Sequence, residues 1–141
     1  MNITPYLSFN GQAEEAANFY ADVLGGKVEY ISRYESMPSV EGMEVPEDCK
    51  QLILHSTVTF PGGFINVADA LPGDKRNFGK GCVLTIYCDS IAHAEEVYAK
   101  LIKNAQEVHC ELCESFFAKL YAELTDQYGV LWSIYLRCEC D

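Results

Sequence analysis

Positive charge is scarce in this sequence. Ten lysine and arginine residues stand against 21 aspartates and glutamates, which gives a formal net charge of -11. A chain this acidic lacks the general electrostatic attraction that draws proteins to nucleic acid or anionic membranes, so we expect neither partner. Long apolar runs are missing too, because no stretch approaches the roughly 18 residues of a membrane span. No basic segment followed by an apolar stretch opens the sequence, so we expect no signal peptide and a cytoplasmic protein.

Cysteine is more abundant, with seven residues. An odd number without an export signal is typical of free thiols in a reducing compartment. Cys82 and Cys88 fall in an apolar strand pattern, which predicts two small buried hydrophobic residues. The pairs Cys110/Cys113 and Cys138/Cys140 together offer four thiols for a structural zinc. The single residue between the second pair is too short for the usual zinc spacing, so surface thiols are the preferred interpretation.

A strand-helix pattern occurs twice, about eighty residues apart, and such repeats indicate two similar modules. Each copy is followed by three further segments with strand character. The first copy predicts a strand at 3–9, a helix with Asn10 as its N-cap and Gly25 at its end, and strands at 27–34, 51–60 and 64–68. The second predicts a strand at 82–88, a helix capped by Asp89 or Ser90 and ending near 103, and strands at 106–110, 116–124 and 130–136.

This order predicts an α+β fold of two tandem βαβββ modules within a single domain, residues 1–141. Module one spans 1–70, a connector spans 71–81, module two spans 82–137, and a short tail covers 138–141. The segment 36–48 carries two prolines, one glycine and several acids, which predicts an exposed loop.

Alternation along the strands predicts one apolar face for each helix and one face of polar and aromatic side chains. In one strand, for example, Leu54 and Val58 alternate with His55 and Thr57. The second kind of face is too mixed for a dry core and is typical of a ligand cleft. We expect the cleft to be lined by His55, Asn66, Thr85, Tyr87, Lys119, Tyr121, Ser133 and Tyr135.

Several of these side chains have two interpretations. His55 is the histidine expected on the cleft face, where it is either a general base or a hydrogen-bonded group in a wet cleft. Lys119, Tyr121 and Glu123 share one strand face, where they either supply acid, base and anion-binding groups or include a rim ion pair. Aromatic residues including Phe116 and Phe117 form either cleft walls or packing contacts.

Three motifs span nearly the whole chain. They are Pro5-Tyr6-Leu7-Ser8-Phe9-Asn10-Gly11 with the helix to Phe19-Tyr20, then Ala68-Asp69-Ala70-Leu71-Pro72-Gly73, and Leu124-Thr125-Asp126-Gln127-Tyr128-Gly129-Val130-Leu131-Trp132. Together they resemble the PhnB-like branch of the vicinal-oxygen-chelate superfamily, which includes glyoxalase I, extradiol dioxygenases and bleomycin-resistance proteins. The resemblance implies curved mixed sheets around a cleft, and a homodimer.

Enzymes of that superfamily hold a divalent metal with His, Glu or Gln from the first and last strands of each module. By register, the resemblance places these positions at Pro5, Asn66, Val83 and Ser133. Pro and Val offer no donor atom, while Asn and Ser are weak neutral ligands, so we expect no metal and no cofactor. Members of this branch are sometimes labelled ubiquinone-pathway methyltransferases. The sequence has no glycine-rich strand-to-helix loop for a nucleotide cofactor, so we set that label aside.

The leading hypothesis is a metal-free protein that binds a small molecule of unknown identity in the cleft. One alternative is a divalent-metal-dependent lyase or dioxygenase with unrecognised ligands. Another is a dimeric interaction scaffold without a ligand. Metal content and the presence of a ligand separate the three.

Overall fold

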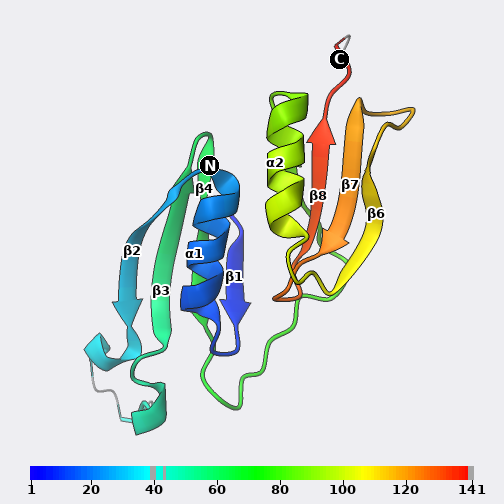
Figure 1. Cartoon of the computed structure of the whole chain (residues 1–141). Helices are drawn as coiled ribbons and strands as arrows, with labels where there is room; N and C mark the ends of the chain where they lie inside the picture. The colour runs from blue at the N-terminus through cyan, green and yellow to red at the C-terminus, as the bar shows by residue number, and fades with distance from the viewer. Residues whose placement is uncertain (39–40, 43, 140–141) are drawn as a thin grey trace. The chain divides into compact units, whose positions relative to one another are not determined.

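The computed structural model describes residues 1–38, 41–42 and 44–139, and it divides the chain into two compact units. Unit one comprises residues 1–77 and unit two residues 78–141. Each unit is an open, mixed, four-stranded sheet with one helix packed on one face (Figure 1). The predicted α+β fold is therefore confirmed. Within the described residues, no helix has the length and apolar character needed to cross a membrane.

Unit one has the element order that the sequence predicts. Its bounds are β1 (Tyr6–Phe9), α1 (Ala13–Leu24), β2 (Lys27–Arg33), the short 3-10 helices η1 (Tyr34–Ser36) and η2 (Glu47–Cys49), β3 (Ile53–Phe60) and β4 (Gly63–Asp69). The sheet order is β1-β4-β3-β2, with β1 parallel to β4 and the other pairs antiparallel. The segment predicted as a loop, 36–48, includes the end of η1 and the start of η2, and its residues 39, 40 and 43 lie outside the described residues.

Alternate residues of unit one are buried against α1, as the period-two pattern predicts. Val58 and Val67 are 0 % exposed, and the helix buries Ala13 and Tyr20 against them to the same degree. One expectation was wrong: Ile53, not Leu54, is the buried residue at the start of β3. The register jumps there, since Ser32 pairs with His55 and the next residue of β2 pairs with Ile53. Leu54 is the extra residue of this bulge, so the inward-facing position shifts by one.

Asn10 does not cap α1, contrary to the sequence prediction. Its side chain bonds the backbone of Arg76, with Nδ2 donating to the carbonyl at 2.6 Å and Oδ1 accepting from the amide at 2.8 Å. The buried carboxylate of Asp69, at the end of β4, takes the capping role. Its Oδ1 accepts from the backbone N–H groups of Gly11 at 2.8 Å and Ala13 at 2.9 Å, and its Oδ2 from that of Ile53 at 3.0 Å. An acidic group at a helix N-terminus is also favoured by the helix dipole.

The end of α1 depends on two glycines. Gly25 adopts the left-handed conformation, with φ of 67°, and its amide bonds the last turn, as the sequence predicts. Gly26 has a different requirement, because a Cβ atom there would lie 1.8 Å from the carbonyl oxygen of Thr59. The pair therefore ends the helix and lets the chain pass closely against β3.

Unit two repeats the plan. Its bounds are β5 (Leu84–Tyr87), α2 (Ile91–Leu101), β6 (Glu107–Cys113), β7 (Leu120–Thr125) and β8 (Leu131–Leu136). The sheet order is β5-β8-β7-β6, with β5 parallel to β8. Of the two caps considered, Ser90 is the one used, since its hydroxyl accepts from the backbone N–H of His93 at 3.1 Å. The core of this unit includes Leu101, Leu124 and Ile134, each 0 % exposed.

Two sequence expectations in unit two were wrong. The strand predicted from residue 116 begins at Leu120, because Ser115 forms a turn in which its hydroxyl accepts from the amides of Phe117 and Ala118. Ser, with its short polar side chain, favours such turns over a strand ladder. Cys82, expected to be buried, is exposed and precedes β5, whereas Cys88 is buried as predicted.

Candidate functional site

In unit one, the sheet face opposite α1 carries a cluster around His55. The Tyr6 hydroxyl lies 3.1 Å from His55 Nδ1, and the two rings are 5.6 Å apart. The ring of Tyr30, on β2, lies 6.0 Å from the imidazole on another side. Both tyrosines are 55 % exposed. The histidine that lacked an identifiable partner in the sequence therefore lies between two exposed aromatic rings.

Thr57 joins His55 to Asn66 on the same face. Its hydroxyl donates to Asn66 Oδ1 at 3.2 Å and lies 3.5 Å from His55 Nε2. The order follows from the register, because Thr57 pairs with Asn66 and Asn66 pairs with Tyr6. Two of the predicted site residues, His55 and Asn66, are thus brought together through a residue that the site prediction left out.

In unit two, the face opposite α2 is an aromatic cluster centred on Tyr135. Its ring lies 5.3 Å from that of Tyr87, 6.0 Å from Phe117 and 6.3 Å from Tyr121. Phe117 also packs on Tyr121, at 5.0 Å with the rings nearly perpendicular, which is a favoured aromatic geometry. The hydroxyl of Tyr135 donates to the carbonyl of Phe117 at 2.7 Å, which holds the turn before β7 against the cluster. Tyr87 is 57 % exposed and Phe117 41 %.

Polar groups border this aromatic cluster. The hydroxyls of Thr85 and Ser133, paired across β5 and β8, lie 2.6 Å apart. The Tyr121 hydroxyl donates to Glu123 Oε2 at 2.9 Å. Burial, followed by this hydrogen bond to an anion, raises the pKa of Tyr121 to about 12, since both disfavour the phenolate. Tyr121 is thus a neutral hydrogen-bond donor throughout the physiological pH range.

Lys119 forms an ion pair other than the one considered from the sequence. It precedes β7, and its Nζ lies 3.5 Å from Oε1 of Glu139 in the tail. The sequence suggested an ion pair between Lys119 and Glu123, but Lys119 pairs with Glu139 instead. The Glu123 carboxylate accepts a hydrogen bond from Tyr121. Both ends of the Lys119 pair are solvent-exposed, so it contributes little to stability.

Arg137 is a component of this face that the site prediction missed. It follows β8, and its guanidinium carbon lies 4.8 Å from the centre of the Tyr87 ring, within cation–π range. Continuing the alternation Ser133, Tyr135 by two residues reaches Arg137 on the same face, so the pattern contained the signal. Phe116, considered as a wall residue, is 98 % exposed.

The positions at which the resemblance places metal ligands do not fit a metal. Pro5 and Val83 lie just before β1 and β5 and offer no donor atom. In unit one, the residue that pairs with Asn66 is Tyr6, whose hydroxyl contacts His55. In unit two, Ser133 pairs with Thr85, and the two hydroxyls bond each other. These are neutral oxygens with other partners, a poor set for a divalent cation.

The remaining candidates are the other two histidines and the two cysteine pairs. His93 is in the first turn of α2, where its Nδ1 accepts from the amide of Asp89 at 3.2 Å. The Nε2 atom of His109 lies 2.8 Å from the Thr125 hydroxyl. Of the two cysteine pairs, Cys110 and Cys113 are free thiols, while Cys140 lies outside the described residues. Among the residues that the structure describes, no group of three or more His, Cys, Asp or Glu forms a potential metal site.

Comparison with known proteins agrees with this architecture. The family model described as 3-demethylubiquinone-9 3-methyltransferase matches residues 1–135. The chain is similar to protein PA1353 from Pseudomonas aeruginosa, with 29 % identity, a TM-score of 0.85, and coverage of 97 % of this chain and 98 % of that one. It is similar to a PhnB protein from Bacillus cereus, with 28 % identity, a TM-score of 0.79, and coverage of 96 % and 99 %.

A more distant likeness concerns the fold alone. A glyoxylase/bleomycin resistance protein/dioxygenase domain from Frankia sp. EAN1pec has 14 % identity and a TM-score of 0.69, with coverage of 100 % of this chain and 95 % of that one. These findings confirm the resemblance that the sequence motifs carry, both to the PhnB-like branch and to the wider superfamily fold.

Proposed function

This chain belongs to the family described as 3-demethylubiquinone-9 3-methyltransferase, and we propose that it binds a small amphipathic aromatic cation without using a metal. The reaction in the family's description requires a methyl donor. The β1–α1 connection reads Asn10-Gly11-Gln12, with one glycine, and is not the glycine-rich loop that holds a nucleotide cofactor. We therefore leave methyl transfer out of the proposal.

The aromatic face of unit two is the observation that carries this proposal. Four rings form one cluster in which each lies 5.0 to 6.3 Å from at least one other, namely those of Tyr87, Phe117, Tyr121 and Tyr135. Two of them remain more than 40 % exposed. A well-ordered group of exposed rings bordered by hydroxyls and a carboxylate has the composition of a ligand surface rather than of a core.

Charge favours a cationic ligand over an anionic one. The net charge is -11, and Glu123 lies on the aromatic face. Tyr87 already holds a cation over its ring, the guanidinium of Arg137. A ligand ammonium or guanidinium group can take the same position by displacing Arg137, so its net gain is the difference between two cation–π contacts of about 0.5–2 kcal/mol each.

Titration calorimetry with a matched pair of ligands tests the proposal. Phenyltrimethylammonium and benzenesulfonate share a ring but carry opposite charge, and we expect the cation to bind more tightly. Tyr87→Ala should weaken binding of the cation by about 3- to 30-fold, because it removes the ring surface that the ligand covers. Tyr98→Ala, on α2 and hence on the other side of the same sheet, is the matched control and should leave the affinity unchanged. Equal binding of both ligands, or no effect of Tyr87→Ala, would refute the proposal.

Two further measurements separate the alternatives. Elemental analysis of protein purified without chelator should show no stoichiometric transition metal, and one such ion per chain would favour the lyase or dioxygenase alternative. We also propose that the protein is a homodimer, which light scattering tests. If Tyr87→Ala or Tyr135→Ala converts a dimer to monomers while no ligand binds, the aromatic face is an interface and the scaffold alternative holds.

A further inference from the structure

Cys110 and Cys113 lie on β6 with two residues between them, an odd step that normally puts side chains on opposite faces of a strand. The register shows a bulge that changes this. Cys110 is paired with Glu123 and Cys113 with Tyr121, so two residues on β6 oppose a single residue on β7. Because Glu123 and Tyr121 share a face, the extra residue of the bulge brings both cysteines to that face as well.

The two thiols are neighbours on this face. Cys113 helps to raise the pKa of Cys110, and both cysteines are in the free form. Cys113 is exposed, while Cys110 is half-buried. Two cysteines three residues apart on a strand reach disulfide geometry only if the backbone between them moves. They also lie on a strand at the edge of the sheet, where such movement is least restricted.

We propose that Cys110 and Cys113 are a redox-active dithiol that closes to an intramolecular disulfide by exchange with a small cationic disulfide. The exposed Cys113 attacks as thiolate, forms a mixed disulfide and releases one thiol of the reagent. Cys110 then attacks the Cys113 sulfur and releases the second thiol. The protein loses two electrons and two protons. The reagent takes up these electrons and protons as it is reduced to two thiols. This inference is independent of the proposed ligand function.

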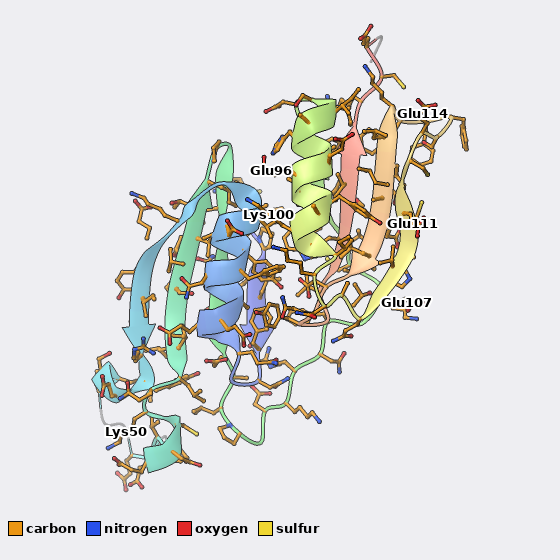
Figure 2. The ribbon with its side chains drawn as sticks, in the orientation of Figure 1. Lys50, Glu96, Lys100, Glu107, Glu111 and Glu114 are labelled. Carbon is orange, nitrogen blue, oxygen red and sulfur yellow. The ribbon has the colours of Figure 1, made fainter. Side chains whose placement is uncertain are left out.

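The acidic surroundings determine which reagent reacts faster. Glu107, Glu111 and Glu114 follow one another along β6 and just after it, as Figure 2 shows, and Glu123 faces Cys110 from β7. These carboxylates attract a cationic disulfide and repel an anionic one at low ionic strength. Burial, Cys113, Glu123 and Glu111 all raise the pKa of Cys110, so the closing step should accelerate as the pH rises.

Exchange with cystamine, a cationic disulfide, tests the proposal. The Cys82→Ser/Cys138→Ser variant removes two other thiols that could react. In this background, we expect peptide mapping to show Cys110 joined to Cys113, with two hydrogen atoms lost and no cystamine fragment retained. The Cys110→Ser variant should instead keep the fragment on Cys113. Oxidised glutathione, which is anionic, should react about 10-fold more slowly at low salt, and high salt should reduce this difference.

Each part of the inference has an outcome that overturns it. A stable cystamine adduct on Cys113 while Cys110 is intact would show that the dithiol does not close. A disulfide from Cys113 to any other cysteine, within or between chains, would show that the bulge does not define the pair. Equal rates with cystamine and oxidised glutathione at low salt would remove the charge selectivity. The Cys82→Ser variant alone should close as the wild type does.

Discussion

Replacing Asp126 with asparagine should lower the free energy of unfolding of unit two by about 1–3 kcal/mol. The carboxylate is 0 % exposed and accepts hydrogen bonds from three donors. Its Oδ1 accepts from the backbone N–H groups of Tyr128 at 2.8 Å and Val130 at 3.0 Å, and its Oδ2 accepts from the indole Nε1 of Trp132 at 2.8 Å. The side chain thus fixes the β7–β8 turn and anchors a core tryptophan.

The size of this effect follows from what an amide can replace. Asparagine keeps one oxygen, which can still accept from the two backbone groups, but its NH2 group then faces the indole N–H. Two buried donors without an acceptor between them cost about 1–3 kcal/mol. Trp132→Phe removes the indole donor, so Asp126→Asn should cost less in that background. The double-mutant cycle should therefore show a coupling of about 1–2 kcal/mol between the two positions.

Urea denaturation followed by circular dichroism measures all four members of the cycle. Fluorescence of Trp132, the single tryptophan, reports on unit two in the variants that retain it. Asp74→Asn is the control, because this exposed aspartate bonds Arg76 at the surface of unit one and should leave the midpoint unchanged. Additive effects of the Asp126 and Trp132 substitutions would refute the reasoning, since the two side chains would then not share a hydrogen bond that matters.

Three other substitutions and titrations follow from the structure. Gly26→Ala should lower the free energy of unfolding by about 3 kcal/mol in urea denaturation, because its Cβ would lie 1.8 Å from the Thr59 carbonyl oxygen. Gly81→Ala, whose Cβ would have no atom within 4 Å, should lower it far less. Tyr121 should ionise late in an ultraviolet titration, since burial and Glu123 raise its pKa to about 12, and this late step should vanish in Tyr121→Phe. The stability from its neutral form is present below pH about 10 and is lost as the pH rises through about 12. Burial raises the pKa of Cys88 to about 11, so a thiol reagent at pH 8 should modify Cys88 more slowly than the exposed cysteines. The free energy of unfolding should also fall as the pH rises through 11. Rapid modification of Cys88 in the folded protein would contradict both expectations.

The sequence predicted the fold because its strongest signals are local and repeated. Alternating strands such as 130–136 and the glycine stop after α1 need only neighbouring residues to be read, and both lie where they were expected. The same alternation placed Tyr121, Ser133 and Tyr135 on one face, and the register confirms that they share it. Whether that face binds a ligand stays a prediction.

The features that the sequence did not reveal depend on residues far apart in the chain. Asp69 caps α1 from 56 residues away, and nothing near Asn10 indicates that its own side chain turns to Arg76. The bulges in β2–β3 and β6–β7 are also non-local, because an extra residue is defined only by the strand opposite. One such bulge moved the core position from Leu54 to Ile53. The other placed Cys110 and Cys113 together, although their spacing argued for opposite faces.

The hydrogen bonds of the two polar faces limit how much each side chain can add to ligand affinity. Asn66 Oδ1 already accepts from Thr57, and Ser133 is already bonded to Thr85. A ligand that recruits these groups exchanges one hydrogen bond for another, and the net gain of such an exchange is about 0.5–1.5 kcal/mol at most. The exposed rings of Tyr87 and Phe117 have apolar surface still open to solvent, and covering it yields about 25 cal/mol per Å2. On the unit-two face the rings should therefore supply most of the affinity, while its hydroxyls determine which ligand is accepted, because a ligand that cannot replace their bonds leaves buried polar groups unpaired.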